Sequence, residues 1–263
     1  MSVQQARSNS TVKIKKLVTA ALFCAMAYVA MFVTSWIKVG FLTFDAKDTF
    51  VTIAGLLFGP LYALLISLTV ALLELITVGD TGFWGFLMNF LSTAAFSCTC
   101  ALIYKYKKNM KGAAIGLCVG AVSMTAMMMI LNLVVTPIYT GMTTGQIAAM
   151  IPKLFLPFNL AKATMNVAFV LVLYKPISRA LKGLRVTGMP ALPVEDRPEP
   201  AEDRRRSMGR NAAVIGIACL LIALSVVVFV VVLDGGFTLQ TVYDKILRLF
   251  RRGCSTFLCT TFG

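Results

Sequence analysis

The sequence predicts an all-α membrane protein, with a bundle of six transmembrane helices plus one additional C-terminal transmembrane helix. Hydrophobic residues make up 58% of the 263 residues and charged residues only 14%, whereas a soluble domain has about 45–50% apolar and about 25% charged residues. The apolar residues also gather in runs that can cross a bilayer as helices. These runs lack the alternating polar residues of a membrane β-strand.

Seven apolar runs mark the expected helices. Six form the body, at 17–37, 49–58, 61–78, 85–104, 112–136 and 151–174, and the seventh is 211–233. The Gly59–Pro60 pair separates the second run from the third. The chain is thereby divided into a cytoplasmic tail (1–16), a six-helix body (17–183), a charged, Pro-containing cytoplasmic linker (184–210), an extra transmembrane helix (211–233) and an amphipathic tail (234–263).

Basic residues gather on one side of this arrangement and orient it. The formal net charge is +14. Seventeen Lys and Arg residues fall in the N-terminal tail, the 105–111 turn and the 175–210 segment, whereas the opposite loops carry only Lys38 and Lys47. The positive-inside rule places the basic side in the cytoplasm. We therefore expect a multi-pass cell-membrane protein with a cytoplasmic N-terminus, surrounded by lipid and without a nucleic-acid partner.

Residue types that several chemical functions require are scarce. The sequence has no His, the commonest general base and metal ligand. Its seven Cys form no CxxC pair, and it has no Walker-type GxxxxGK[ST] loop. We expect a protein that is not an enzyme, does not itself hydrolyse ATP, and has no catalytic residue, metal site or cofactor. The spacing of Cys254 and Cys259 leaves open whether they form a disulfide.

Ionisable side chains inside the six spans are candidates for function, because such groups are costly in lipid. They are Glu74, Lys153 and Lys162. Glu74 and Lys153 lie near the expected outer ends of their helices, where a long side chain can reach the interface. Lys162 lies deeper, which favours a contact with a ligand.

Polar residues around Lys162 predict a lined pocket. Asn159 and Lys162 share one helical face at i, i+3 spacing. Pro157 frees a backbone carbonyl nearby, which is tolerated where a helix lines a polar cavity. Asn89 and Asn132 lie in neighbouring runs, and each alone more often forms a hydrogen bond between helices. Together these side chains suit a solute that carries carbonyl and hydroxyl groups.

Aromatic and small residues mark further surfaces. The segment 41–45 (FLTFD) and the turn 83–84 (FW) lie near the same outer face. They suit either an aromatic belt at the headgroups or a wall for a flat ligand. Ala21 and Ala25 in the first span and a GxxxG pattern at 116–120 in the fifth predict close packing. The alanine pair fits packing inside the body or docking of a membrane partner.

These features resemble the S components, the substrate-binding subunits, of energy-coupling-factor (ECF) vitamin transporters over about residues 13–183. The shared features are six short helices, a basic N-terminus, the alanine pair and Gly59–Pro60. Two stretches are similar to the riboflavin-specific branch: 41–60, which begins FLTFDAKD and ends FGP, and 156–162, LPFNLAK. The second is the more specific, because Pro-Phe-Asn-x-x-Lys is unusual inside a span.

The resemblance implies an S-component fold and riboflavin as the transported ligand. It implies two ATPase subunits and a transmembrane coupling subunit as partners, with Ala21 and Ala25 docking the latter. It also implies that two asparagines and a lysine contact the vitamin while an outer loop covers it. With Asn89 added from the pocket argument, the expected substrate-binding residues are Leu42, Thr43, Asp45, Asn89, Asn132, Asn159 and Lys162.

Three alternatives stay open. An S component for thiamine, folate or a queuosine precursor would share the fold. A membrane-embedded enzyme needs clustered catalytic groups, which are scarce here. A structural or regulatory membrane protein would use the seventh helix to recruit a partner. The segment from Val186 onward lies outside the usual six-helix unit, and its role and the side of its tail are not determined by the sequence.

Overall fold

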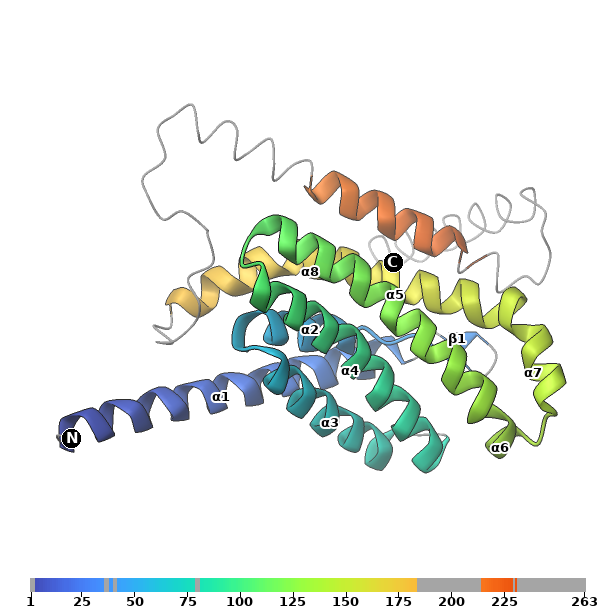
Figure 1. Ribbon diagram of the computed structural model, residues 1–263, viewed down its shortest axis with the longest axis horizontal. Coiled ribbons are helices and arrows are strands. Elements are labelled where there is room, and N and C mark those ends of the chain that lie inside the picture. The colour runs from blue at the N-terminus through green and yellow to red at the C-terminus, as the bar shows by residue number, and fades with distance from the viewer. Residues whose placement is uncertain are drawn as a thin grey trace, which may run out of the picture.

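The computed structural model describes residues 3–35, 38–39, 42–78, 81–183, 214–228 and 230, which are helical apart from turns and one short hairpin (Figure 1). The hairpin pairs β1 (Lys38–Val39) with β2 (Leu42–Thr43) in antiparallel fashion. The helices are α1 (Val3–Thr34), α2 (Lys47–Phe58), α3 (Pro60–Thr77), α4 (Gly82–Tyr106), α5 (Met110–Val134), α6 (Thr136–Thr140), α7 (Thr144–Met150), the π-helix η1 (Ile151–Phe155) and α8 (Leu156–Gly183). The predicted all-helical membrane fold is confirmed.

The described residues contain fewer helices long enough to cross a membrane than the predicted six plus one. Within the described residues, five helices are long and apolar enough to cross a membrane: Ile14–Thr34, Pro60–Thr77, Gly82–Tyr106, Lys111–Val134 and Thr144–Leu181. The predicted second span corresponds to α2, which has 12 residues and is too short to cross a bilayer. The described part of the predicted seventh span is a short apolar helix, Val214–Val228. Six spans plus one therefore stays a prediction.

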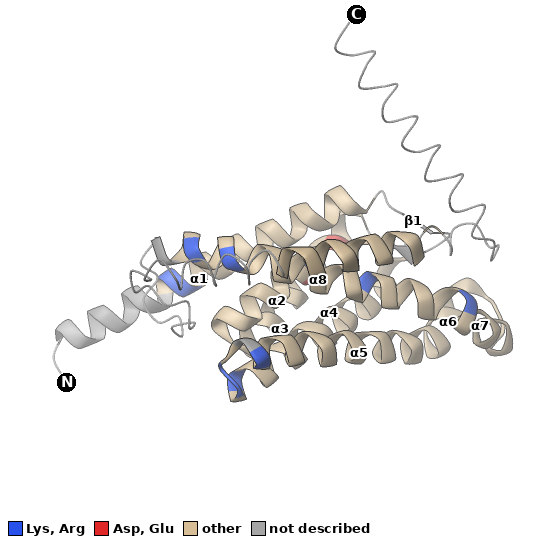
Figure 2. Ribbon diagram, turned by 90° about the horizontal axis from the view of Figure 1, so that it is seen from above, with Lys and Arg blue, Asp and Glu red and all other residues tan. Residues whose placement is uncertain are grey.

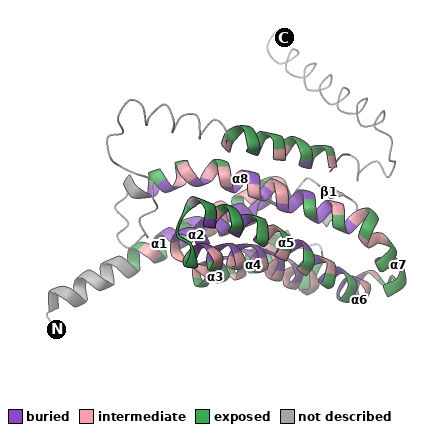
Figure 3. Cartoon of the chain, turned by 45° about the horizontal axis from the view of Figure 1, so that its top comes forward, coloured by how far each residue is buried: buried purple, intermediate pink, exposed green. Residues whose placement is uncertain are grey.

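Helix α2 is an interior element. Ten of its 12 residues are buried, and it packs against α1, α3, α4 and α8. Its apolar side chains form one core with Phe23 of α1 and Phe96 of α4. Figure 3 shows buried residues concentrated where the helices face one another. A hydropathy pattern cannot distinguish such a central helix from a spanning one, because both are apolar all round.

Glycines allow one tight turn and one close contact between helices. Gly59 has φ 103°, a conformation that favours glycine, and it ends α2 immediately before Pro60 begins α3. In α5, a Cβ added at Gly116 or Gly120 would lie 3.1 Å or 3.0 Å from carbonyl oxygens of α4. The GxxxG pattern therefore marks the α4–α5 contact, and the predicted packing face is confirmed.

The connection from α5 to α8 is helical. Thr143 and Gln146 form a capping box at the start of α7. The chain then passes through η1, where the backbone N–H of Leu156 donates to the carbonyl of Ile151. Single π-helical turns often occur at functional sites. This one lies directly before the LPFNLAK stretch.

The two ends of the bundle differ in charge. Figure 2 shows basic segments at the start of α1, at the α4–α5 turn and toward the end of α8, all at the same end. Helix α1 begins at Val3, so the described part of the predicted N-terminal tail continues the first span as a helix. The whole linker (184–210), the whole 234–263 tail and both Cys254 and Cys259 lie outside the described residues.

Candidate ligand-binding site

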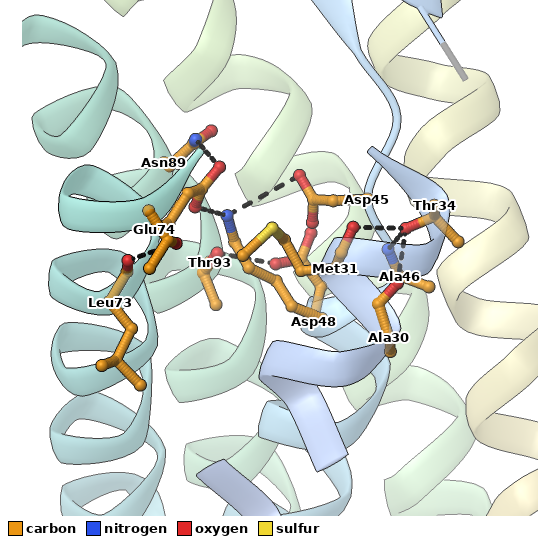
Figure 4. Close-up of polar contacts among 12 residues, drawn as sticks. Ala30, Met31, Thr34, Asp45, Ala46, Asp48, Leu73, Glu74, Asn89 and Thr93 are labelled. Atoms are coloured by element: carbon orange, nitrogen blue, oxygen red, sulfur yellow. Dashed lines mark hydrogen bonds and ion pairs between the residues drawn. The ribbon is translucent and has the colours of Figure 1, made fainter. Parts of the chain in front are cut away.

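A chain of buried and partly buried ion pairs joins several elements at the end of the bundle opposite the basic segments. Lys162 Nζ of α8 donates to Asp45 Oδ2 over 2.8 Å, and Lys47 Nζ at the start of α2 lies 3.7 Å from the same oxygen. Lys47 also donates to Glu74 Oε2 of α3. Asn89 of α4 donates to Glu74 Oε1 over 2.7 Å. Figure 4 shows Asp45, Glu74 and Asn89 turned toward this shared centre.

A second polar network lies beside the first and ties α2 to α4 and α8. Asp48 Oδ1 accepts a 2.6 Å hydrogen bond from Thr93 Oγ1 (Figure 4). Its other oxygen accepts from Asn166 Nδ2 over 3.4 Å. Asn166 Oδ1 in turn accepts from Thr49 Oγ1 over 2.8 Å. All four side chains are buried, so the start of α2 is held by polar contacts as well as by apolar packing.

The local sequence explains why so many charges meet at the start of α2. The backbone N–H of Ala46 donates to Thr34 Oγ1 over 3.1 Å, which anchors the segment between β2 and α2 to the end of α1. Asp45 and Lys47 flank that anchor. Asp48 lies in the first turn of α2, where the helix dipole favours a negative charge.

Ion pairing keeps the carboxylate of Asp45 charged although it is buried. Three carboxylates (Asp45, Asp48 and Glu74) lie close to two ammonium groups (Lys47 and Lys162). Burial raises the pKa of Asp45, but the ammonium groups of Lys162 and Lys47 outweigh that effect and hold the pKa below its usual value. Buried charges are tolerated only when paired in this way.

Two buried oxygens of this region have no hydrogen-bond partner within the described residues. They are Asp45 Oδ1 and Asn159 Oδ1. The amide nitrogen of Asn159 donates to the Phe155 carbonyl over 2.8 Å, which leaves the amide oxygen as the free end. Buried polar atoms without partners are rare. Donor groups of a bound solute would satisfy both oxygens, so the arrangement suits a ligand that carries hydroxyl or N–H groups.

The structure brings some of the predicted site residues together and leaves others apart. Asp45 and Lys162 are bonded directly, and Asn89 is connected to them through Glu74 and Lys47. Leu42 and Thr43 lie on β2 just before Asp45.

Asn132 has a different environment. It is buried in α5, donates to the Met128 carbonyl over 2.7 Å and accepts from Thr136 over 3.0 Å. Among the described residues, these bonds stay within α5 and the start of α6. Asn132 is therefore satisfied without any contact to the Asp45–Lys162 pair.

Several residues of the two networks were not identified from the sequence. The sequence predicts an outer loop for Lys47 and Asp48, and it leaves either an interfacial or a functional role open for Glu74. Asn166 lies four residues after Lys162 on the same helical face, a spacing that could have revealed it. Lys153 is exposed, in agreement with an interfacial position.

The alanine pair of α1 faces away from the bundle. Ala21 and Ala25 are exposed and continue a stripe with Leu17 and Val29, whereas Phe23 on the other face is fully buried. Among the described residues, nothing packs closely on this stripe. The structure thus places the pair on the outside rather than inside the body.

An all-helical bundle with a buried charged cluster and unpaired acceptors at one end has the features of a membrane-embedded solute-binding protein. The family model for the substrate-specific component of ECF transporters matches residues 15–177. The chain belongs to this family, and the predicted resemblance is confirmed.

Individual relatives point to the same family. The riboflavin transporter RibU of Staphylococcus aureus (strain TCH60) is 31% identical over 178 residues, which cover 64% of this chain and 93% of that protein. The riboflavin transporter FmnP of Bacillus subtilis (strain 168) is 29% identical over 175 residues, covering 62% and 92%. A solved structure of the S component of a bacterial ECF transporter matches with a TM-score of 0.55 and 29% identity, covering 65% of this chain and 99% of that one.

Proposed function

We propose that this chain captures riboflavin, or a closely related flavin, at the Asp45–Lys162 end of the bundle. It then mediates uptake of the flavin with an ATPase-driven coupling module. Two curated relatives named as riboflavin transporters support the choice of ligand. The charge asymmetry supports an orientation with this end outside and the N-terminus in the cytoplasm. In this role the chain is a binding subunit and not an enzyme, and riboflavin is its cargo rather than a cofactor.

The chemistry of a flavin matches the polar groups at this end. The isoalloxazine ring carries carbonyl acceptors and an N–H donor, and the ribityl chain carries hydroxyl groups that both donate and accept. The side-chain oxygens left free on Asp45 and Asn159 are acceptors, and Lys162 supplies an ammonium donor. This combination of free acceptors and a buried lysine is the observation that carries the proposal.

Binding is tested by titrating the purified full-length protein with riboflavin and following the quenching of flavin fluorescence. Asn159→Ala and Lys162→Ala should each weaken binding by about 1–3 kcal/mol, because polar groups of the ligand or the site lose their partners. That range is roughly a fivefold to 150-fold rise in Kd. Lys153→Ala is the matched control, since Lys153 is an exposed lysine just upstream on η1, and its Kd should not change.

Two outcomes would contradict the binding proposal at different levels. Unchanged affinity in both Asn159→Ala and Lys162→Ala would remove these residues from the site while leaving the ligand in place. A wild-type protein that ignores riboflavin but binds thiamine, folate or a queuosine precursor would keep the transporter class and exclude the flavin. Binding of none of these would favour a structural or regulatory role.

The exposed alanine stripe supports a docking role in the same transport cycle. Small side chains let the backbone of a partner helix approach closely, and Ala21 and Ala25 offer such a surface on the outside of α1. We therefore assign the stripe to the transmembrane coupling subunit, which works with two ATPase subunits in this proposal.

The docking assignment separates binding from transport. Ala21→Leu together with Ala25→Leu should keep the affinity for riboflavin, because both residues face away from the site, and should abolish uptake by cells that express the full module. Ala126→Leu on the exposed face of α5 is the matched control and should leave uptake intact. Full uptake by the double variant would exclude the alanine stripe as the docking surface.

A further inference from the structure

A cavity lies at the basic end of the bundle, away from the ion-pair cluster. Its volume is about 570 Å³, and it is formed by the α2–α3 junction with parts of α1 and α4. The Gly59–Pro60 break forms part of its wall, because the chain reverses direction there between two packed helices. The cavity shares no lining residue with the networks around Asp45 and Asp48.

Three lysines from two different helices line this cavity. They are Lys16 of α1, Lys105 of α4 and Lys108 just after α4. Lys105 and Lys108 are exposed and Lys16 is half-buried. Within the described part of the chain, none of the three forms an ion pair, whereas both buried lysines at the opposite end do. The cavity therefore presents concentrated, uncompensated positive charge.

The remaining wall is apolar and continues onto an exposed helix face. Leu57, Leu61 and Tyr62 line the cavity. Leu61 is 65% exposed, and Leu64 and Leu65 follow it one turn along α3 at 39% and 51% exposure. A strip of leucines at i, i+3 and i+4 on a membrane helix faces the acyl chains of the lipid. The cavity thus joins a cationic rim to a lipid-facing surface.

We propose that this cavity binds one anionic phospholipid. Its headgroup phosphate lies against Lys16, Lys105 and Lys108, and an acyl chain follows the leucine strip of α3. The lysines complement the negative charge, and each basic residue near a membrane surface contributes to the attraction of anionic lipid. A soluble phosphate would use the lysines and leave the apolar wall unoccupied, so a lipid fits the whole surface better.

The proposal is tested by native mass spectrometry of the full-length protein, delipidated in detergent and titrated with phosphatidylglycerol or with phosphatidylcholine. One phosphatidylglycerol should bind at least tenfold more tightly than phosphatidylcholine. Replacing the three lining lysines by glutamine should weaken the binding of phosphatidylglycerol at least tenfold, because each lysine contributes to the attraction of the anionic headgroup. Circular dichroism checks that the variant is folded, and if it is not, Lys105→Gln alone should give about a fivefold loss.

A matched variant with the same loss of charge distinguishes a specific lipid site from nonspecific electrostatic attraction of anionic lipid to the protein. Lys111→Gln, Lys153→Gln and Arg179→Gln together remove three exposed charges that do not line the cavity, and this variant should retain phosphatidylglycerol. Equal loss in both triple variants, or equal binding of the two lipids, would overturn the proposal. So would displacement of the lipid by millimolar inorganic phosphate. If the variant without the three lining lysines kept its lipid binding but no longer assembled with the coupling module, the surface would be a protein contact. That result would likewise overturn the proposal.

Discussion

The ion pair between Asp45 and Lys162 should be the most strongly coupled contact in the protein. Its atoms are 2.8 Å apart, and the side chains are only 4% and 5% exposed. Replacing either partner alone leaves the other charge buried, which typically costs about 3–5 kcal/mol. Lys162→Met should fall at the lower end, since Asp45 keeps Lys47 at 3.7 Å. Asp45→Asn should cost more, because Lys162 loses the only carboxylate with which it forms an ion pair among the described residues.

Removing both partners tests the reasoning more sharply than either single change. With the five groups ionised, the cluster of three carboxylates and two lysines carries a charge of −1. Lys162→Met makes it −2 and Asp45→Asn makes it neutral, whereas the double variant returns it to −1 without an orphaned partner. The double variant should therefore be more stable than the sum of the single effects predicts, by about 2–3 kcal/mol.

The coupling is measured as the free energy of unfolding in detergent micelles, from denaturant titrations followed by circular dichroism. The titrations are done without riboflavin, since a ligand that binds only the folded state would add its own stabilisation. Lys153→Met, at an exposed position, serves as the control and should change the unfolding free energy little. Additive single effects, within about 0.5 kcal/mol, would refute the ion pair.

Three further changes test the packing and the second network by the same unfolding measurement. Thr93→Val should cost about 1.5–3 kcal/mol, because the charged acceptor Asp48 loses its 2.6 Å hydrogen bond. Thr93→Ser keeps the hydroxyl and should retain most of this stability. Equal stability of the two variants would argue against the hydrogen bond. Gly120→Ala should cost about 1–3 kcal/mol, since its Cβ would meet α4 at 3.0 Å, while Gly145→Ala has open space and should be neutral or slightly stabilising. Gly59→Ala should cost about 1–3 kcal/mol, because φ 103° and ψ 172° lie in a region that is essentially restricted to glycine. An unchanged unfolding free energy would show that the backbone relaxes there.

The sequence identified the key residues of the candidate site more readily than their partners. Lys162 was recognisable because an ionisable side chain deep in an apolar run is rare and costly. Its partner Asp45 is 117 residues away, and only the family resemblance predicts Asp45 at the site. No local pattern encodes such a pairing, since it depends on how α8 packs beside the start of α2.

The length and placement of α2 were the main features that composition could not give. Hydropathy predicts a transmembrane span for a short apolar run when the neighbouring runs are transmembrane spans. The structure instead encloses this helix among four others, so its polar first turn is buried with it: Lys47, Asp48 and Thr49 are each at most 1% exposed. Hydropathy treats these residues as a loop before a helix, and burial turns them into the centre of the polar networks.

The two ends of the bundle differ in how their lysines are paired, and this difference favours a different kind of ligand at each end. At the Asp45 end, both lysines are neutralised by carboxylates and the unsatisfied groups are acceptors, so that end is matched to donors on an uncharged polar solute. At the opposite end, the cavity lysines have no such carboxylates within the described residues, so that end is matched to anions. The same excess of basic residues on which the proposed membrane orientation rests thus distinguishes the proposed cargo site from the proposed lipid site.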